Sequence, residues 1–187
     1  MGPRSHRLEA EFRELLDIPH AVAVSSCMAA LHLALLGLGI GPGDEVVTTP
    51  LSFASTANVL VHLGAVPVFA DVETDTLNLA PDRVAARIGP RTKAILPVHL
   101  HGHPCDMDAM TALADRHGLP IVEDAAHAIE AAFKERRMGA DSTAATFSFY
   151  ATKNITTGEG GMLVTRRKDL AERAEILRLH GMSRDAW

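Results

Sequence analysis

The sequence predicts an α/β fold in which a mainly parallel sheet carries helices on both faces. Short β-rich runs alternate along the chain with runs of helical periodicity. Several strand runs are apolar at nearly every position, which is typical of parallel strands buried on both sides. The 187 residues are 47% hydrophobic and contain no low-complexity tract, so one sizeable core is expected.

The elements of the first half follow this alternation. Residues 8–16 have helical periodicity, and 21–24 (AVAV) form a short strand run. Residues 28–39 are apolar almost all round, which predicts a buried helix. A glycine-rich turn within 41–49 leads into a strand, and 54–64 predict a helix whose final glycine is a candidate C-cap.

The second half continues the pattern. Residues 106–118 predict a helix with Asp106 as N-cap and Gly118 as its stop, and 168–181 predict a charged amphipathic helix. The remaining strand runs lie at 66–72, 93–100, 119–128, 144–150 and 161–165. No internal repeat or linker interrupts these elements, so the chain is expected to be one domain or part of one.

Composition excludes several classes of function. The net charge of -5 gives no electrostatic reason to expect a nucleic acid partner, and the cluster 134–137 (KERR) predicts a solvated turn. Cys27 and Cys105 lie far apart and outside any C-x-x-C pair, which disfavours a disulfide framework and fits a reducing cytoplasm. The N-terminus lacks the apolar segment of a signal peptide, and the apolar run 29–40 is too short to cross a bilayer.

Ligands of open parallel sheets bind beyond the carboxyl ends of the strands. The residues that follow the predicted strands are therefore the candidates for a site. These are Ser25 to Met28, Thr48 to Phe53, His99 to His103, Asp124 to His127 and Ser148 to Lys153.

Lys153 stands between an apolar run and a glycine-rich turn, in SFYATKNITTGEGG. A lysine after a strand is usually a solvated surface charge. An amine sheltered in such a turn loses its proton more readily and can attack a carbonyl to form a Schiff base.

Asp124 ends a predicted strand in IVEDAAHA. It is either a helix N-cap or a carboxylate that binds a cationic ring nitrogen, as pyridoxal phosphate enzymes require. His127 follows three residues later, so its candidacy as a ligand-binding residue depends on its place beside Asp124.

Three further positions have both a structural and a functional interpretation. Ser25 or Ser26 caps the helix that follows, and the start of that helix is also a natural phosphate site. Phe53 is either a core residue or a ring that stacks on a planar cofactor. Ser148 is either an ordinary strand residue or a hydroxyl donor to phosphate.

The histidines of HLHGH, at 99, 101 and 103, do not predict a metal site, because no acidic residue or cysteine stands at a convincing spacing. No G-x-G-x-x-G, P-loop or G-x-S-x-G motif occurs, which disfavours nucleotide-dependent dehydrogenases, NTPases and serine hydrolases.

Four segments together resemble the DegT/DnrJ/EryC1/StrS aminotransferases. They are the run from SSCMAALHLALL to DVETDTLNL, then VHLHGHPCDMDAM, VEDAAHAIEA and FSFYATKNITTGEGGMLVT. Enzymes of this family are fold-type I pyridoxal 5'-phosphate (PLP) enzymes that act mostly on keto sugars attached to nucleotides. The resemblance covers nearly the whole chain and implies a seven-stranded sheet of the PLP-dependent transferase large-domain type.

The resemblance implies a role for each candidate. Lys153 matches the lysine that forms the internal aldimine and moves protons, and Asp124 matches the acid paired with the pyridine nitrogen. His127 matches the position beside the phenolic oxygen of the cofactor, and Phe53 matches the aromatic residue that stacks on its ring.

Ser148 and the Cys27–Met28 turn match the groups that bind phosphate. A hydroxyl residue usually stands where this chain has Met28, so one side-chain donor is missing there. No metal ligand is implied.

The implied function is transfer of an amino group from glutamate or glutamine to a keto sugar nucleotide, by an enzyme that is a homodimer in its full-length form. Lys153 argues against the related sugar dehydratases, which have histidine at this position, whereas an aminohydroxybenzoate branch stays open. Family members are about twice this length, so residues 1–187 are expected to be an incomplete PLP-binding large domain without the small C-terminal domain.

The alternative is a truncated, non-catalytic remnant that keeps the large-domain fold and binds the cofactor or a partner chain. A third hypothesis, an α/β domain without a cofactor, treats the match at the lysine, the aspartate and the phosphate turn as coincidence.

Overall fold

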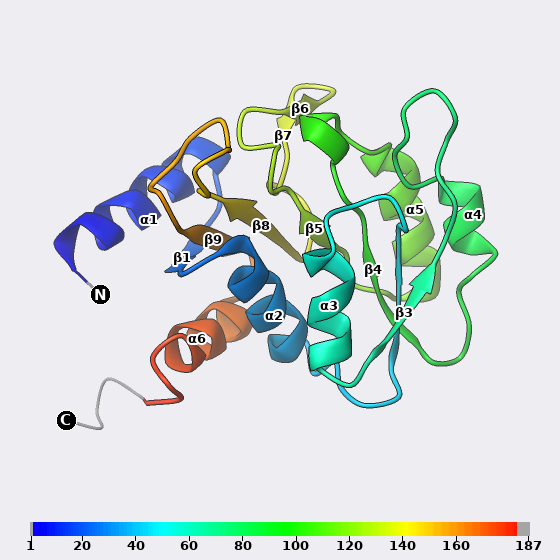
Figure 1. The fold of residues 1–187 in the computed structure, drawn as a ribbon, viewed down its shortest axis with the longest axis horizontal. Coiled ribbons are helices and arrows are strands. Elements are labelled where there is room, and N and C mark those ends of the chain that lie inside the picture. The colour runs from blue at the N-terminus through cyan, green and yellow to red at the C-terminus, as the bar shows by residue number, and fades with distance from the viewer. Residues whose placement is uncertain (1, 183–187) are drawn as a thin grey trace.

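Seven strands form one sheet in the computed structural model, which describes residues 2–182 (Figure 1). Parallel bridges from Ile95 to Ile121 and from Val98 to Asp124 join the group β3-β2-β4 to the group β5-β8-β9-β1. Within this sheet β9 runs antiparallel to both of its neighbours, so the sheet is mainly parallel, as predicted. The strands are β1 (His20–Val24), β2 (Glu45–Thr48), β3 (Val66–Phe69), β4 (Thr92–Leu96), β5 (Val122–Asp124), β8 (Ala144–Ser148) and β9 (Gly161–Thr165).

Helices cover both faces of the sheet and form a separate core on each. One core contains α1 (Pro3–Leu16), α4 (Pro81–Ala85) and α5 (Met107–His117). The other contains α2 (Cys27–Gly37), α3 (Ser55–His62) and α6 (Lys168–Leu177). Successive residues of one strand face opposite cores: Val46 belongs to the core that contains α2, and Val47 to the core that contains α5. The predicted two-sided fold is therefore confirmed.

The apolar run that predicted a buried helix is α2, which packs against the sheet, α3 and α6 (Figure 1). Burial on several sides explains why this helix lacks a polar face. The predicted end signals are also confirmed for α5, where Asp106 accepts a hydrogen bond from the Ala109 N–H and Gly118 adopts φ 62°. Gly64, after α3, has φ 74°.

The alternation along β8 determines where Ser148 points. Phe147 and Phe149 both make edge contacts with Phe12 of α1, at ring-centroid distances of 5.5 Å. Because side chains alternate along a strand, Ser148 between them faces the opposite side, where α2 begins. Packing of three aromatic rings thus orients one hydroxyl of the site.

A few short elements were not predicted. They are the single turn of α4, the 3-10 turn η1 (Leu100–Gly102), and the hairpin of β6 (Ala132–Phe133) and β7 (Arg136–Arg137). The predicted solvated turn at 134–137 coincides with this hairpin, whose turn residues Lys134 and Glu135 have positive φ. None of the helices described is both long and apolar enough to cross a membrane.

Candidate active site

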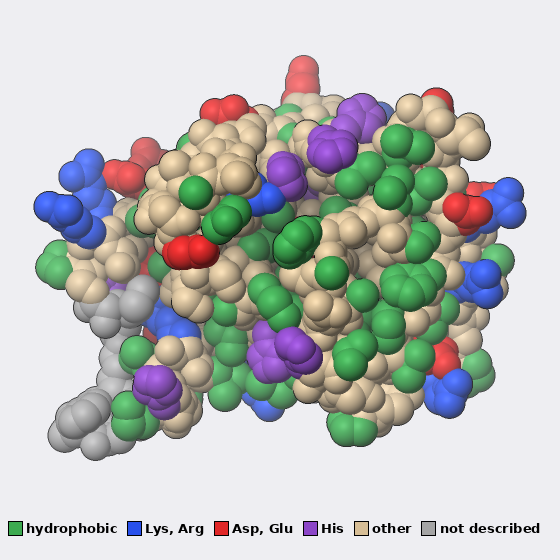
Figure 2. All heavy atoms as spheres, in the orientation of Figure 1, with side chains coloured by type: hydrophobic (Ala, Val, Ile, Leu, Met, Phe, Trp, Pro, Cys, Tyr) green, Lys and Arg blue, Asp and Glu red, His purple; other side chains and the backbone are tan. Residues whose placement is uncertain are grey.

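A cavity of about 770 Å³ opens at the carboxyl ends of the strands. Its lining includes the seven residues to which the resemblance assigns a role, and they come from four separate segments of the chain. These residues are Cys27, Met28, Phe53, Asp124, His127, Ser148 and Lys153. Histidine side chains gather over the upper part of the face shown in Figure 2, beside a recessed cationic side chain.

Lys153 and His127 meet inside this cavity. Lys153 lies in the turn after β8, where its backbone N–H donates to the Tyr150 carbonyl. Its Nζ lies 2.5 Å from Nε2 of His127, which is in the turn after β5. Partial burial, together with the nearby charges of Lys153 and His101, holds the pKa of His127 below its usual value. The lowered pKa favours the neutral imidazole near neutral pH, in which Nε2 is able to accept a hydrogen bond from Lys153 Nζ.

The turn that contains His127 is closely packed against η1. A side chain at Gly102 would place its Cβ only 2.7 Å from the His127 carbonyl oxygen, so this position requires glycine. The His101 ring meets the His127 ring edge to face, with centroids 6.1 Å apart. These contacts fix the imidazole beside Lys153.

Asp124 ends β5 and is only 4% exposed, yet it lines the cavity. Burial raises the pKa of its carboxyl group, and hydrogen bonds from the Thr56 hydroxyl and the Ala126 N–H partly offset this effect. Among residues 2–182, no lysine, arginine or histidine side chain forms an ion pair with the Asp124 carboxylate. A cationic ring nitrogen in the cavity would supply this missing partner, so the residues fit the pyridine end of PLP.

The start of α2 provides hydrogen-bond donors for an anion. Ser26 is the N-cap, and its Oγ accepts from the Ala29 N–H at 3.1 Å. The backbone N–H groups of Cys27 and Met28, the first two helical residues, have no acceptor within the helix. They line the cavity together with Ser148, so a phosphate fits here.

Gly161 allows the sheet to approach this helix start. It pairs with Ser148 across β8 and β9. A Cβ at Gly161 would lie 2.3 Å from the backbone carbon of Ser26 and 2.5 Å from the nitrogen of Cys27. The close approach of β9 to α2 therefore depends on a missing side chain.

Cys27 and Phe53 occupy the cavity in different ways. The Cys27 thiol points away from the anion site, toward Thr146 Oγ1 at 3.5 Å, and burial raises its pKa, so only its backbone serves the phosphate position. The Phe53 side chain is 81% exposed, although it is a large apolar ring. It lines the cavity, so an exposed aromatic ring is available there for stacking on a planar ligand.

Sequence reasoning missed Thr56, whereas His99 was among the strand-end candidates but was given no specific role. Thr56 donates to Asp124, and His99 is a buried wall residue whose Nε2 lies 2.8 Å from Glu123. The Cys105 N–H donates to His99 Nδ1, so the ring proton is on Nε2 and points to Glu123. His99 and Glu123 lie near the ends of neighbouring strands, but the sequence pattern does not give the register that brings them into contact. Within the described part of the chain, no group of three or more metal-ligating side chains forms.

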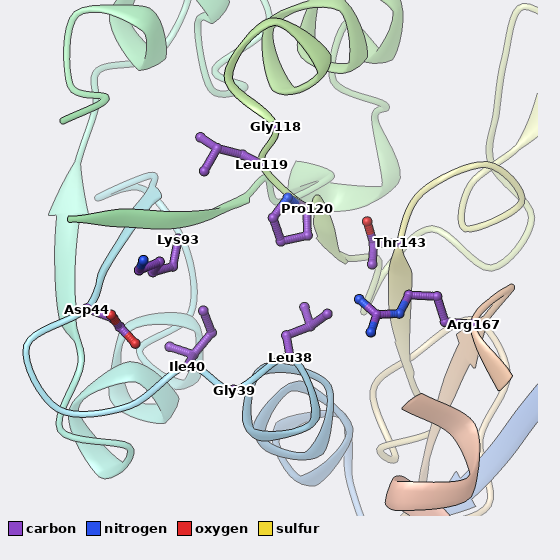
Figure 3. Close-up of a pocket in the computed structure, with 10 residues that line it drawn as sticks. All are labelled: Leu38, Gly39, Ile40, Asp44, Lys93, Gly118, Leu119, Pro120, Thr143 and Arg167. Atoms are coloured by element: carbon purple, nitrogen blue, oxygen red, sulfur yellow. The ribbon is translucent and has the colours of Figure 1, made fainter. Parts of the chain in front are cut away.

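A second cavity, of about 580 Å³, lies away from these residues and is shown in Figure 3. Its ionic side chains are Lys93, Asp44 and Arg167, and Arg167 is already paired with Asp169. None of the nominated residues lines it. Of these two cavities, only the first is therefore lined by the candidate catalytic and cofactor-binding residues.

Comparison with known proteins identifies the family. Residues 1–187 match the DegT/DnrJ/EryC1/StrS aminotransferase family. The chain belongs to this family. Its curated relatives include the spore coat polysaccharide biosynthesis protein SpsC of Bacillus subtilis, which is 55% identical over 186 residues. That match covers 100% of this chain and 48% of SpsC, so the chain spans about half the length of the relative.

Solved structures of aminotransferases have the same fold. DesV of S. venezuelae superposes with a TM-score of 0.97 at 48% identity, over 100% of this chain and 51% of DesV. The PLP form of the putative sugar aminotransferase Spr1654 from Streptococcus pneumoniae has a TM-score of 0.93 at 31% identity, over 98% of this chain and 52% of Spr1654. The α/β fold of PLP-dependent aminotransferases, expected from the sequence resemblance, is thereby confirmed for this family member.

Proposed function

We propose that this chain is the PLP-binding large-domain part of an aminotransferase that moves an amino group from glutamate or glutamine to a keto sugar nucleotide. One observation carries the proposal. Lys153, Asp124 and the open N–H groups of α2, which come from distant segments, line a single cavity. These are an amine, an acid and an anion site, the three contacts that one PLP molecule requires.

Each residue has a defined task in this proposal. Lys153 would hold the cofactor covalently through Nζ, and as a free amine it would carry a proton at that atom. Asp124 binds the ring nitrogen, Phe53 stacks on the ring, and the start of α2 with Ser148 binds the phosphate. His127 accepts the Lys153 proton through Nε2, at the 2.5 Å contact.

Bound PLP supplies an electron-withdrawing ring that accepts the electron pair of the bond broken at the amine-bearing carbon. The contribution of the protein is to keep the ring nitrogen protonated through Asp124 and to deliver protons through Lys153. The buried position of Asp124 excludes water from that contact and strengthens it.

The substrate class is supported by the relatives. DesI was solved in the presence of its TDP-sugar product, at 40% identity and a TM-score of 0.93. An aromatic substrate is the second candidate, because 3-amino-5-hydroxybenzoic acid synthase matches at 41% identity with a TM-score of 0.95. We further propose a homodimer of the full-length form, a cytoplasmic location, and no nucleic acid or membrane partner. Neither Cys27 nor Cys105 is in a disulfide, which supports a reducing compartment.

Reductive labelling tests the lysine directly. The purified chain is incubated with PLP, reduced with borohydride and digested, and the pyridoxyl label is mapped by mass spectrometry. We expect the label on Lys153, its loss in Lys153→Ala, and its retention in the matched control Lys93→Ala. A label scattered over surface lysines would contradict the assignment.

Turnover separates an enzyme from a remnant. We expect the unreduced chain, loaded with PLP, to release 2-oxoglutarate from glutamate. It should then aminate a keto sugar nucleotide. Binding of PLP at Lys153 without any amino transfer would favour the non-catalytic remnant that keeps the large-domain fold.

A further inference from the structure

Thr56 connects two parts of the cavity that the proposed function uses separately. It lies in the first turn of α3 and is 1% exposed. Its hydroxyl donates to Asp124 Oδ2 at 2.8 Å, although the two residues are 68 positions apart. Its backbone N–H donates to the Phe53 carbonyl at 3.1 Å. One buried residue thus contacts both the acid at the ring nitrogen and the loop that presents the stacking ring.

The hydrogen bonds around Thr56 have a definite direction. An ionised carboxylate only accepts, so the single Thr56 proton goes to Asp124. The Ser52 hydroxyl, 2.8 Å from Thr56 Oγ1, must then donate to Thr56. Ser52 therefore donates a hydrogen bond to Thr56, and Thr56 donates one to Asp124. These directions reverse only when the Asp124 carboxyl group is protonated.

Of the hydrogen bonds that the structure describes at the Asp124 carboxylate, the one from Thr56 is the shortest. The Ala126 N–H donates to Oδ1 at 3.2 Å, and the Cys27 thiol lies 3.9 Å from the same oxygen. The titratable groups that face Asp124 are Cys27 from α2, His99 after β4, His127 in the following turn, and Lys153 from the β8–β9 loop. None of these four donates a short hydrogen bond to the carboxylate, whereas Thr56 does.

We propose that Thr56 is a positioning residue that keeps Asp124 ionised and aligned with the cofactor ring while it anchors the Phe53 loop on the same ring. The inference rests on the proposed function, because it presumes that Asp124 pairs with a ring nitrogen. Hydrogen bonds to a buried charge contribute more than those between neutral groups, so loss of this one hydroxyl has a measurable effect.

The test compares Thr56→Val, which keeps the shape and removes the hydroxyl, with Thr56→Ser, which keeps the hydroxyl. The Asp124 carboxyl is titrated by carbon-13 NMR in the cofactor-free chain, with Asp124→Asn to assign its signal. We expect Thr56→Val to raise the pKa of Asp124 and to weaken PLP affinity about tenfold, the loss of one charge-assisted hydrogen bond. Thr56→Ser should match the wild type in both measurements.

Two results would overturn the proposal: an Asp124 titration in Thr56→Val equal to that of the wild type, or equal impairment of Thr56→Ser and Thr56→Val. If Thr56→Val does not fold, Ser52→Ala tests the same chain of hydroxyls at a half-buried position. A raised pKa of Asp124 there supports the proposal, and an unchanged one counts against it. The failure of the proposed function and the failure of this inference give different results. If only the proposed function fails, the wild-type protein binds no PLP at Lys153, but the pKa of Asp124 in the cofactor-free protein still changes in Thr56→Val.

Discussion

Nε2 of His127 lies 2.5 Å from Nζ of Lys153, although 26 residues separate them in the sequence. The contact joins the turn after β5 to the turn after β8, so it depends on the parallel pairing of these two strands. Burial and the neighbouring charges of Lys153 and His101 keep the pKa of His127 low. The imidazole is consequently a proton acceptor whose partner is already in place.

Replacement of His127 should slow the reaction of Lys153 with PLP. The amine must lose a proton before it attacks a carbonyl, and His127→Gln retains a hydrogen-bond acceptor that cannot take this proton. We expect the rate to fall by about a hundredfold, the lower end of general acid–base effects. Stopped-flow absorbance of PLP binding measures it, with His103→Gln, outside the cavity, as the control.

The pH dependence of that rate provides a second readout of His127. Its pKa is lowered, so protonation removes the acceptor only below the ordinary histidine value of about 6.5. The wild-type rate should therefore decline on the acid side of this value, and His127→Gln should lack this particular decline. An identical acid limb in both proteins would show that another group titrates.

Asp124→Asn should stabilise the cofactor-free chain while it abolishes productive PLP binding. The carboxyl pKa is raised by burial, so the folded state binds more protons than the unfolded state between the ordinary aspartate value of 3.8 and the raised value. Stability is therefore lost as the pH rises through this window. At neutral pH the buried, ionised Asp124 carboxylate lowers the free energy of unfolding. Asparagine avoids this cost, because its amide can donate to Thr56 and its oxygen can still accept from Ala126.

Urea denaturation at several pH values measures this effect. A gain of about 1 kcal/mol is expected at neutral pH, typical of stabilising substitutions at functional sites, and it should shrink on acidification. A less stable Asp124→Asn protein at neutral pH would contradict the explanation.

Phe53→Ala should weaken PLP binding without an effect on folding. The ring is exposed, so its removal should change the free energy of unfolding by less than about 0.5 kcal/mol. Loss of aromatic stacking should lower PLP affinity by about three- to tenfold. Fluorescence titration measures the affinity, and Val61→Ala, an exposed apolar residue of α3 that does not line the cavity, is the matched control.

The site residues that the sequence predicted share one property: each lies at the end of a strand or in the segment that follows it. Because parallel strands end at the same edge, Asp124, Ser148 and Lys153 had to converge once the strands were recognised. Phe53 and the start of α2 follow by the same rule. The topology, rather than any single motif, made it predictable that these side chains meet at one cavity, and their roles stay a prediction.

The supporting contacts were not predictable in this way. Thr56 lies in a helix start, where threonine is common for local reasons, and its contact with Asp124 arises only when α3 packs on the sheet. His99 and Glu123 meet across neighbouring strands, in a register that pattern reading does not provide. Among the elements, α4 is a single turn and too short to show periodicity. The Cys27 thiol direction likewise depends on the side from which α2 approaches β8.

Gly161→Ala should separate the phosphate contact from the rest of the site. The added methyl group would meet backbone atoms of Ser26 and Cys27, at 2.3 to 2.5 Å, and backbone cannot rotate away as a side chain does. The start of α2 must therefore shift, at an expected cost of about 2 kcal/mol in the free energy of unfolding. The N–H groups of Cys27 and Met28 move with it, so the preference for PLP over pyridoxal, which lacks the phosphate, should fall.

Urea denaturation and competitive binding of the two compounds measure these effects, with Gly41→Ala, whose Cβ would meet nothing within 4 Å, as the control. A Gly161→Ala protein with unchanged stability and an unchanged preference for PLP would show that α2 does not bind the phosphate.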